Sequence, residues 1–158
     1  MKNLWSPWRM SYIQSPKTKD QCVFCKALAD EEDAKNFIVF RAKYSFVILN
    51  RYPYTSGHIM VIPFKHVPSL NDLDPETRAE MIELVNKGME LIKKIYQPEG
   101  FNLGANIGEA AGAGIEEHVH LHIVPRWKGD TNFMTSLGNT RVIPESLEDT
   151  YHQIKKVW

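Results

Sequence analysis

The sequence predicts an α+β domain with a mainly antiparallel sheet of about five strands, one long helix and short flanking helices. Three observations lead to this prediction. Several short segments are rich in β-branched and aromatic residues, one long stretch has helical periodicity, and strands seldom alternate with helices along the chain. Neighbouring parallel strands need a long crossover connection, so few such alternations favour antiparallel pairing.

Five segments carry the signals of β-strands. β-Branched and aromatic residues fill the first three, and the fourth leads into the glycine-rich sequence GEAAGAG. The fifth, HVHLHIVP, alternates polar and apolar residues, which is the strongest strand signal in the chain. The expected strands are 36–42, 45–50, 58–63, 101–108 and 118–125.

The long helix has a clear start signal. Asp74, Pro75 and Glu76 supply an N-cap acid, a proline at the first helical position and an acid in the first turn. We expect this helix to end before Pro98. The residues expected on its apolar face are Met81, Ile82, Val85, Met89, Ile92, Ile95 and Tyr96.

Shorter helices are expected near both ends of the chain. One runs from Cys22 to about Lys35. The other follows Pro144, because apolar residues there recur at helical spacing. These residues are Leu147, Tyr151, Ile154 and Trp158.

The chain has 158 residues, the length of one compact domain with a substantial core. We expect a single domain over residues 1–158, with residues 1–21 as an irregular N-terminal arm and residues 128–158 as a C-terminal extension. Nineteen basic residues balance nineteen acidic ones, so no nucleic-acid or membrane partner is expected. No apolar run approaches the ~20 residues that span a bilayer, and the N-terminus lacks the apolar core of a secretory signal. We therefore expect a cytoplasmic protein.

Three histidines occupy every second position of the last expected strand. Residues two apart on a strand share a face, so His118, His120 and His122 line one face, while Val119 and Leu121 face the core. One interpretation is a polar sheet surface that carries histidines by chance. Thr, Lys or Glu would serve such a surface equally well, so three histidines would be an unusual choice. The chemical interpretations are a three-histidine metal site, or phosphoryl or nucleotidyl chemistry by a neutral imidazole. The glycine-rich loop upstream favours the second, since glycines let backbone N–H groups approach phosphates.

The two cysteines form a close pair, Cys22-Val-Phe-Cys25. This spacing is typical of half of a tetrahedral zinc site. A redox pair is the alternative, although no thioredoxin-like βαβ pattern surrounds the cysteines. Two ordinary buried thiols are a third interpretation.

Several motifs resemble one known superfamily. HVHLHIV resembles the His-φ-His-φ-His-φ-φ signature of the histidine triad (HIT) superfamily, and ILNRYPYTSGHIMVIPFKHV resembles its strand–loop–strand nucleotide cradle. NIGEAAGAG is similar to its phosphate-side loop. NLWSPWRMSYI and PRWKGDTNFM resemble the bacterial branch of diadenosine tetraphosphate phosphorylases and ATP adenylyltransferases. The resemblance covers about residues 4 to 135 and implies a HIT-like fold.

The resemblance implies a role for particular residues. His120 is the nucleophile that forms a covalent nucleotidyl-histidine, and His122 contacts the phosphate or the leaving group. Asn50 binds the ribose, and His58 supports the triad from the adjacent strand. The residues implied along the phosphates are Asn106, Gly108 and Gly112.

One position departs from the pattern of the superfamily. Many members have Gln or Ser four residues before the first triad histidine, where the side chain touches the scissile phosphate. This chain has Gly114 there. Backbone amides would have to replace the missing side chain.

The resemblance also implies a way to complete the zinc site. A zinc-containing branch of the superfamily, which includes galactose-1-phosphate uridylyltransferase, adds two histidines to such a cysteine pair. The corresponding positions here are His66 and His118. The implied ligands of a structural zinc ion are therefore Cys22, Cys25, His66 and His118.

The function implied by these motifs is nucleotidyl transfer through His120. The expected substrates are purine nucleotides or dinucleoside polyphosphates such as diadenosine tetraphosphate, with inorganic phosphate as acceptor in a phosphorolysis. The alternatives are a HIT hydrolase of nucleoside phosphoramidates or adenylylated metabolites, a nucleotide-binding protein with little turnover, and a three-histidine metalloenzyme. The resemblance also implies a homodimer or higher homo-oligomer.

Overall fold

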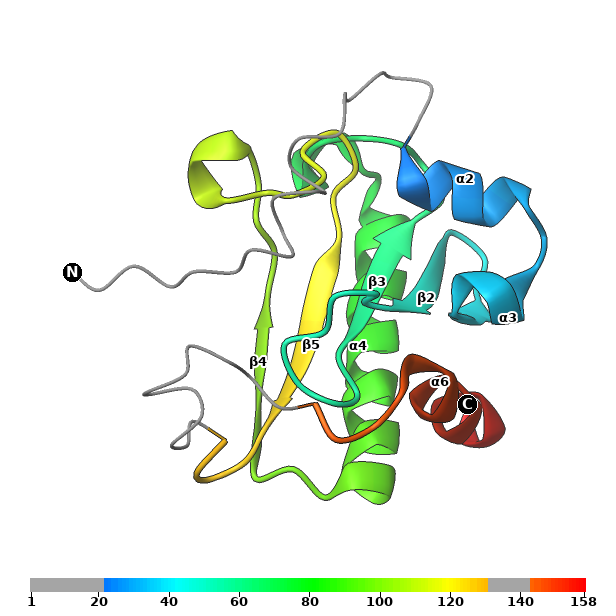
Figure 1. Ribbon diagram of the computed structural model, residues 1–158. Helices are drawn as coiled ribbons and strands as arrows, with labels where there is room; N and C mark the ends of the chain where they lie inside the picture. The colour runs from blue at the N-terminus through cyan, green and yellow to red at the C-terminus, as the bar shows by residue number, and fades with distance from the viewer. Residues whose placement is uncertain (1–21, 131–142) are drawn as a thin grey trace.

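The computed structural model describes residues 22–130 and 143–158. Its sheet has five strands in the order β1-β2-β3-β5-β4, and all neighbouring strands are antiparallel (Figure 1). The predicted α+β fold class is therefore confirmed. The strands are β1 (Ile38–Arg41), β2 (Ser45–Leu49), β3 (Ile59–Pro63), β4 (Gly100–Gly104) and β5 (Leu121–Arg126).

Helices cover both faces of the sheet. Helix α4 (Pro75–Tyr96) and helix α6 (Leu147–Val157) pack on one face, and α2 (Val23–Ala29) packs on the other, followed by the short α3 (Asp33–Asn36). Two short 3-10 helices, η2 (Leu70–Asp72) and η3 (Glu109–Ala111), lie in connections. The sheet therefore separates a large apolar core under α4 and α6 from a smaller one under α2.

Helix α4 begins and ends where the sequence predicts. The Asp74 carboxylate accepts a hydrogen bond from the Thr77 N–H at 2.8 Å, and Gln97 ends the helix in the left-handed conformation. Ile92 is fully buried, whereas Ile82 is 47% exposed, so its assignment to the apolar face was wrong. Within the described residues, no helix is both long and apolar enough to cross a membrane.

The C-terminal helix is confirmed, but the single helix predicted between Cys22 and about Lys35 is wrong. The chain forms α2 and α3 instead. Between them Glu31 has φ of 50°, which an α-helix does not accommodate, so the chain changes direction there. The arm over residues 1–21 and part of the C-terminal extension lie outside the described residues.

All five strands are shorter than predicted. Strand β5 begins at Leu121, three residues after the predicted start. Strand β3 ends at Pro63, and the Val119 N–H then donates to the carbonyl of Val67 in the following loop at 2.8 Å. Residues 118–120 therefore lead into the strand. Strand β4 ends at Gly104, and the chain then turns through η3.

Truncation of buried Ile92 should destabilise the protein far more than truncation of exposed Ile82 on the same helix. We expect Ile92→Ala to lower the free energy of unfolding by about 2–4 kcal/mol, because it leaves a cavity against the sheet. Ile82→Ala should change it by less than about 0.5 kcal/mol. Urea unfolding followed by circular dichroism measures both values. Equal losses would contradict the assignment of this helix face.

Candidate active site and metal-binding cluster

Four histidines lie on the side of the sheet that faces α2, namely His58, His118, His120 and His122. The ring centroids of His120 and His122 are 4.8 Å apart, and those of His58 and His122 are 5.2 Å apart. Phe24 of α2 packs edge-on against both His118 and His120. Val119, between these two histidines, packs into the core under α4, so alternate residues reach opposite faces, as the sequence predicts.

The environment of His120 fixes its tautomer. Its Nδ1 lies 2.9 Å from the backbone carbonyl oxygen of His118. A carbonyl oxygen can only accept, so Nδ1 carries the proton and donates it. The Nε2 atom of a neutral His120 then holds a free lone pair. This arrangement suits a nucleophile.

A second chain of hydrogen bonds fixes His58 and His122. The Tyr54 backbone N–H donates to His58 Nδ1 at 3.1 Å, so the proton of a neutral His58 is on Nε2. His58 Nε2 lies 3.0 Å from His122 Nδ1 and donates to it. His122 must then carry its own proton on Nε2.

Burial favours the neutral forms of these rings. Desolvation, together with the neighbouring His122 and His120, lowers the pKa of His58 to about 3. Burial also lowers the pKa of His120, although its bond to the His118 carbonyl acts in the opposite direction. Both rings are therefore neutral at pH 7, which leaves the His120 lone pair free for chemistry.

Asn50 follows β2 and lies beside His58. Its side-chain oxygen accepts a hydrogen bond from the Tyr52 N–H at 2.9 Å, and its amide nitrogen is 3.4 Å from His58 Nδ1. The Thr55 hydroxyl in the same loop donates to the Pro125 carbonyl at 3.0 Å, which ties the loop to β5. The sequence-predicted ribose residue therefore sits next to the histidine cluster.

The glycine-rich loop is closed by its own hydrogen bond. The Asn106 amide donates to the Gly112 carbonyl at 3.3 Å. Gly108 and Gly112 have φ of 82° and 81°, a conformation that other residues rarely adopt. Gly114 is half-buried on the approach to His118. Asn106 and the two tight-turn glycines thus shape the loop itself.

A second cluster contains four residues that could bind a metal. One potential ligand atom from each lies within 4.8 Å of the others, and the residues are Cys22, Cys25, His66 and His118. Cys22 Sγ is 3.3 Å from His118 Nδ1, and Cys25 Sγ is 3.2 Å from His66 Nδ1. A tetrahedral zinc site with standard bond lengths separates sulfur from nitrogen by about 3.5 Å. The four side chains therefore form a group that could hold a metal ion.

The chemistry of the donor atoms fits a cation. His118 Nε2 donates to the Pro63 carbonyl at 2.9 Å, so its Nδ1 lone pair faces the cysteines. Burial, together with neighbouring Cys22, raises the pKa of the Cys25 thiol to about 11. A bound cation would offset this by favouring the thiolate.

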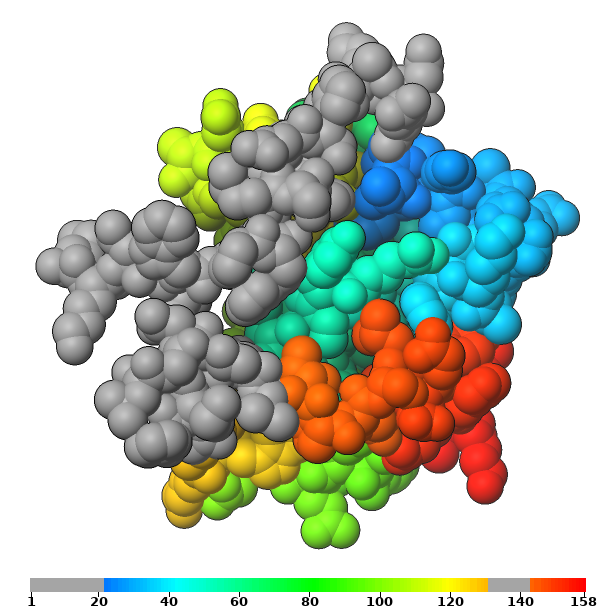
Figure 2. Space-filling model, viewed as in Figure 1, coloured from blue at the N-terminus to red at the C-terminus, as the bar shows by residue number. Residues whose placement is uncertain are grey.

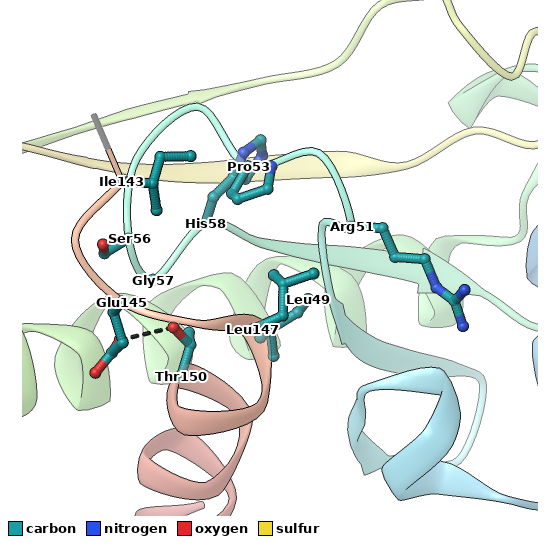
Figure 3. Close-up of a pocket in the computed structure, with 10 residues that line it drawn as sticks. All are labelled: Leu49, Arg51, Pro53, Ser56, Gly57, His58, Ile143, Glu145, Leu147 and Thr150. Carbon is teal, nitrogen blue, oxygen red and sulfur yellow. Dashed lines mark hydrogen bonds between the residues drawn. The ribbon is translucent and has the colours of Figure 1, made fainter. Parts of the chain in front are cut away.

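A hollow of about 220 Å³ lies between the β2–β3 loop and the C-terminal segment (Figure 3). On the face seen in Figure 2, these two segments lie side by side. The walls of the hollow include His58 and Leu49, but neither His120 nor His122. Glu145 and Thr150 at its rim are hydrogen-bonded to each other. The hollow thus adjoins the histidine cluster through His58, without reaching His120 or His122.

Sequence reasoning missed two contacts within this site. Phe24 contacts His118 and His120, and its place between the two cysteines was the available signal. The backbone N–H of Tyr54 orients His58. A contact made by a backbone group cannot be predicted from a pattern of side chains.

Comparisons with known proteins agree with this geometry. The HIT domain family model matches residues 31–129. The AP-4-A phosphorylase of Mycobacterium tuberculosis is 38% identical over 168 residues, covering 100% of this chain and 85% of the relative. The asymmetrical bis(5'-nucleosyl)-tetraphosphatase of Schizosaccharomyces pombe is 37% identical over 93 residues, covering 59% of this chain and 50% of the relative.

The fold has close counterparts among solved structures. The Zn-bound histidine triad family protein from Mycobacterium smegmatis superimposes with a TM-score of 0.70 and 30% sequence identity, covering 88% of this chain and 94% of that one. The motif, the fold and the similarity to enzymes agree. The chain therefore belongs to the HIT domain family and is one of its nucleotide enzymes.

Proposed function

We propose that the protein cleaves dinucleoside polyphosphates, such as diadenosine tetraphosphate, by phosphorolysis through a covalent nucleotidyl-histidine at His120. The observation that carries this proposal is the 38% identity, over the whole chain, to the AP-4-A phosphorylase of Mycobacterium tuberculosis. The hydrogen bond that leaves a lone pair on His120 Nε2 supports the mechanism.

The reaction has two displacement steps. In the first, His120 Nε2 attacks an α-phosphorus, a P–N bond forms, and the P–O bond to the departing nucleotide breaks. In this proposal His122 Nε2–H would donate a hydrogen bond to a phosphate oxygen or the departing oxygen, and the contact with His58 that holds the ring supports this role. In the second, inorganic phosphate attacks the same phosphorus and the P–N bond breaks. Diadenosine tetraphosphate then yields ATP and ADP, and His120 returns to its starting form.

The remaining residues of the proposed site bind and orient the substrate. Asn50 binds the ribose, and His58 fixes the proton on His122. The backbone of the loop from Asn106 through Gly108, Gly112 and Gly114 would lie along the phosphates, which backbone N–H groups suit. The homodimer and the cytoplasmic location stay predictions.

We also propose that Cys22, Cys25, His66 and His118 hold a structural zinc ion. Their four donor atoms would occupy every position of a tetrahedral ion, so none is left for substrate or water. The ion would link α2 to the loop after β3 and to the approach of β5. Its role is to hold these segments together.

Removal of the nucleophile should abolish turnover. We expect His120→Ala to lower kcat/KM for diadenosine tetraphosphate by ~10³-fold or more and to prevent covalent labelling, while the fold is kept. His152→Ala, a change on the exposed side of α6, is the matched control and should be as active as the wild type. Near-normal activity of His120→Ala would rule out the nucleotidyl-histidine mechanism.

The products distinguish the candidate functions in the wild-type protein. With phosphate present, phosphorolysis yields ADP and ATP, whereas hydrolysis yields AMP and ATP. Chromatography of the nucleotides separates these outcomes. Absence of any product would favour a nucleotide-binding protein, the alternative that Gly114 keeps open.

Loss of the Asn50 side chain should weaken nucleotide binding. We expect Asn50→Ala to raise the Kd for AMP by an amount equivalent to about 1–2 kcal/mol, the scale of one hydrogen bond whose partner is left unsatisfied. Calorimetry measures the affinity, and Asn71→Ala on the exposed η2 is the control. An unchanged Kd would place the ribose elsewhere.

The purified protein should contain about one zinc ion per chain, the stoichiometry of a closed four-ligand site. Stripping the ion should lower the melting temperature, because binding to the folded state alone stabilises it. The double variant Cys22→Ser, Cys25→Ser should contain no zinc and melt like the stripped protein. Elemental analysis of freshly purified protein decides the matter. Absence of metal, with no effect of added zinc on melting, would make the cysteines ordinary buried thiols.

A further inference from the structure

The two histidines of the metal-binding cluster have similar surroundings. Each points Nδ1 toward a cysteine sulfur, His66 toward Cys25 at 3.2 Å and His118 toward Cys22 at 3.3 Å. Each points Nε2 toward an oxygen atom. For His118 this oxygen is the Pro63 carbonyl at 2.9 Å. For His66 it is a carboxylate oxygen of Glu117 at 3.9 Å.

A histidine that binds a metal through one nitrogen commonly donates its other N–H to a carbonyl or carboxylate. Such a partner fixes the tautomer and the ring orientation, so that the lone pair is aimed at the ion. A carboxylate also stabilises the partial positive charge that the ring gains when it gives its lone pair to a cation. Glu117 is the residue positioned to do both for His66.

His66 needs such a partner more than His118 does. His118 is fully buried and hydrogen-bonded to the backbone. His66 is exposed in the loop that follows β3. Its side chain is 35% exposed and that of Glu117 is 51% exposed, so solvent weakens their attraction but leaves both side chains free to adjust. A small movement would bring the 3.9 Å contact within hydrogen-bond range.

We propose that Glu117 is a positioning residue of the metal-binding cluster, which holds His66 with Nδ1 directed at the ion. This inference rests on the proposal that the cluster binds zinc. Glu117 directly precedes His118, so one short segment supplies a ligand and the partner of another ligand. The carboxylate thereby links the loop after β3 to the approach of β5.

The test is the zinc affinity of the full-length protein, measured by competition with a chromogenic chelator. Glu117→Gln should raise the Kd for zinc about tenfold, the lower end of the effect of losing such a partner, because the contact is partly exposed. Glu117→Asp keeps the charge and should recover part of the affinity. Glu109→Gln, on η3 of the same long connection, removes an acid of equal charge and should bind zinc like the wild type.

Two further results interpret the outcome. The metal-free forms of all variants should melt together, since the role assigned to Glu117 concerns the loaded cluster. Equal zinc affinity of Glu117→Gln and the wild type would overturn the role of Glu117 and leave the zinc proposal intact. Equal weakening by Glu109→Gln would also overturn it, since total charge would then be the cause. A wild-type protein that takes up no zinc would instead refute the zinc proposal itself.

Discussion

The alternation of side chains along residues 118–123 is the constraint on which the rest of the site depends. Val119, Leu121 and Ile123 are buried in the core beneath α4, and the histidines between them face α2. A shift of one residue would place imidazoles among aliphatic side chains and turn the aliphatic ones outward. The pairing of Met60 with His122 across β3 and β5 fixes the register. Packing energy on one face therefore positions the chemistry on the other.

His118 links the metal-binding cluster to the proposed nucleophile through two different atoms. Its ring faces the cysteines, and its carbonyl accepts the Nδ1 proton of His120. Phe24, which lies between the two cysteines in sequence, also packs edge-on against His120. An ion held by the cluster would thus fix both the backbone and the side chain that orient His120. Such an ion would influence the reaction without contacting the substrate.

Local signals predicted the elements better than they predicted the contacts between them. The acid and proline at the start of α4 fixed its first turn because capping depends on residues close in sequence. Helical periodicity could not exclude Ile82 from the apolar face, because the width of the covered stripe is set by the sheet. Glu31, between α2 and α3, has a left-handed backbone conformation. No glycine at this position indicates that conformation in the sequence.

In the candidate site, too, some features could be predicted from local sequence and others could not. The alternating histidines and the cysteine pair were visible in the sequence because their spacing is itself the signal. The convergence of His66 with the cysteines was implied only through family resemblance. The hydrogen bond from His118 to the Pro63 carbonyl joins residues 55 positions apart. Composition and spacing do not predict such a contact.

Three backbone groups determine the direction of every hydrogen bond among the clustered histidines. The carbonyls of Pro63 and His118 can only accept, and the N–H of Tyr54 can only donate. Neutral rings each have one donor and one acceptor, so these ends leave one tautomer for each ring. Protonation of His58 would remove the acceptor that the Tyr54 N–H requires, and burial opposes that protonation. The proposed site consequently presents a lone pair on His120 beside an N–H on His122. In the proposed reaction the lone pair of His120 would attack phosphorus, and His122 would interact with the phosphate oxygens.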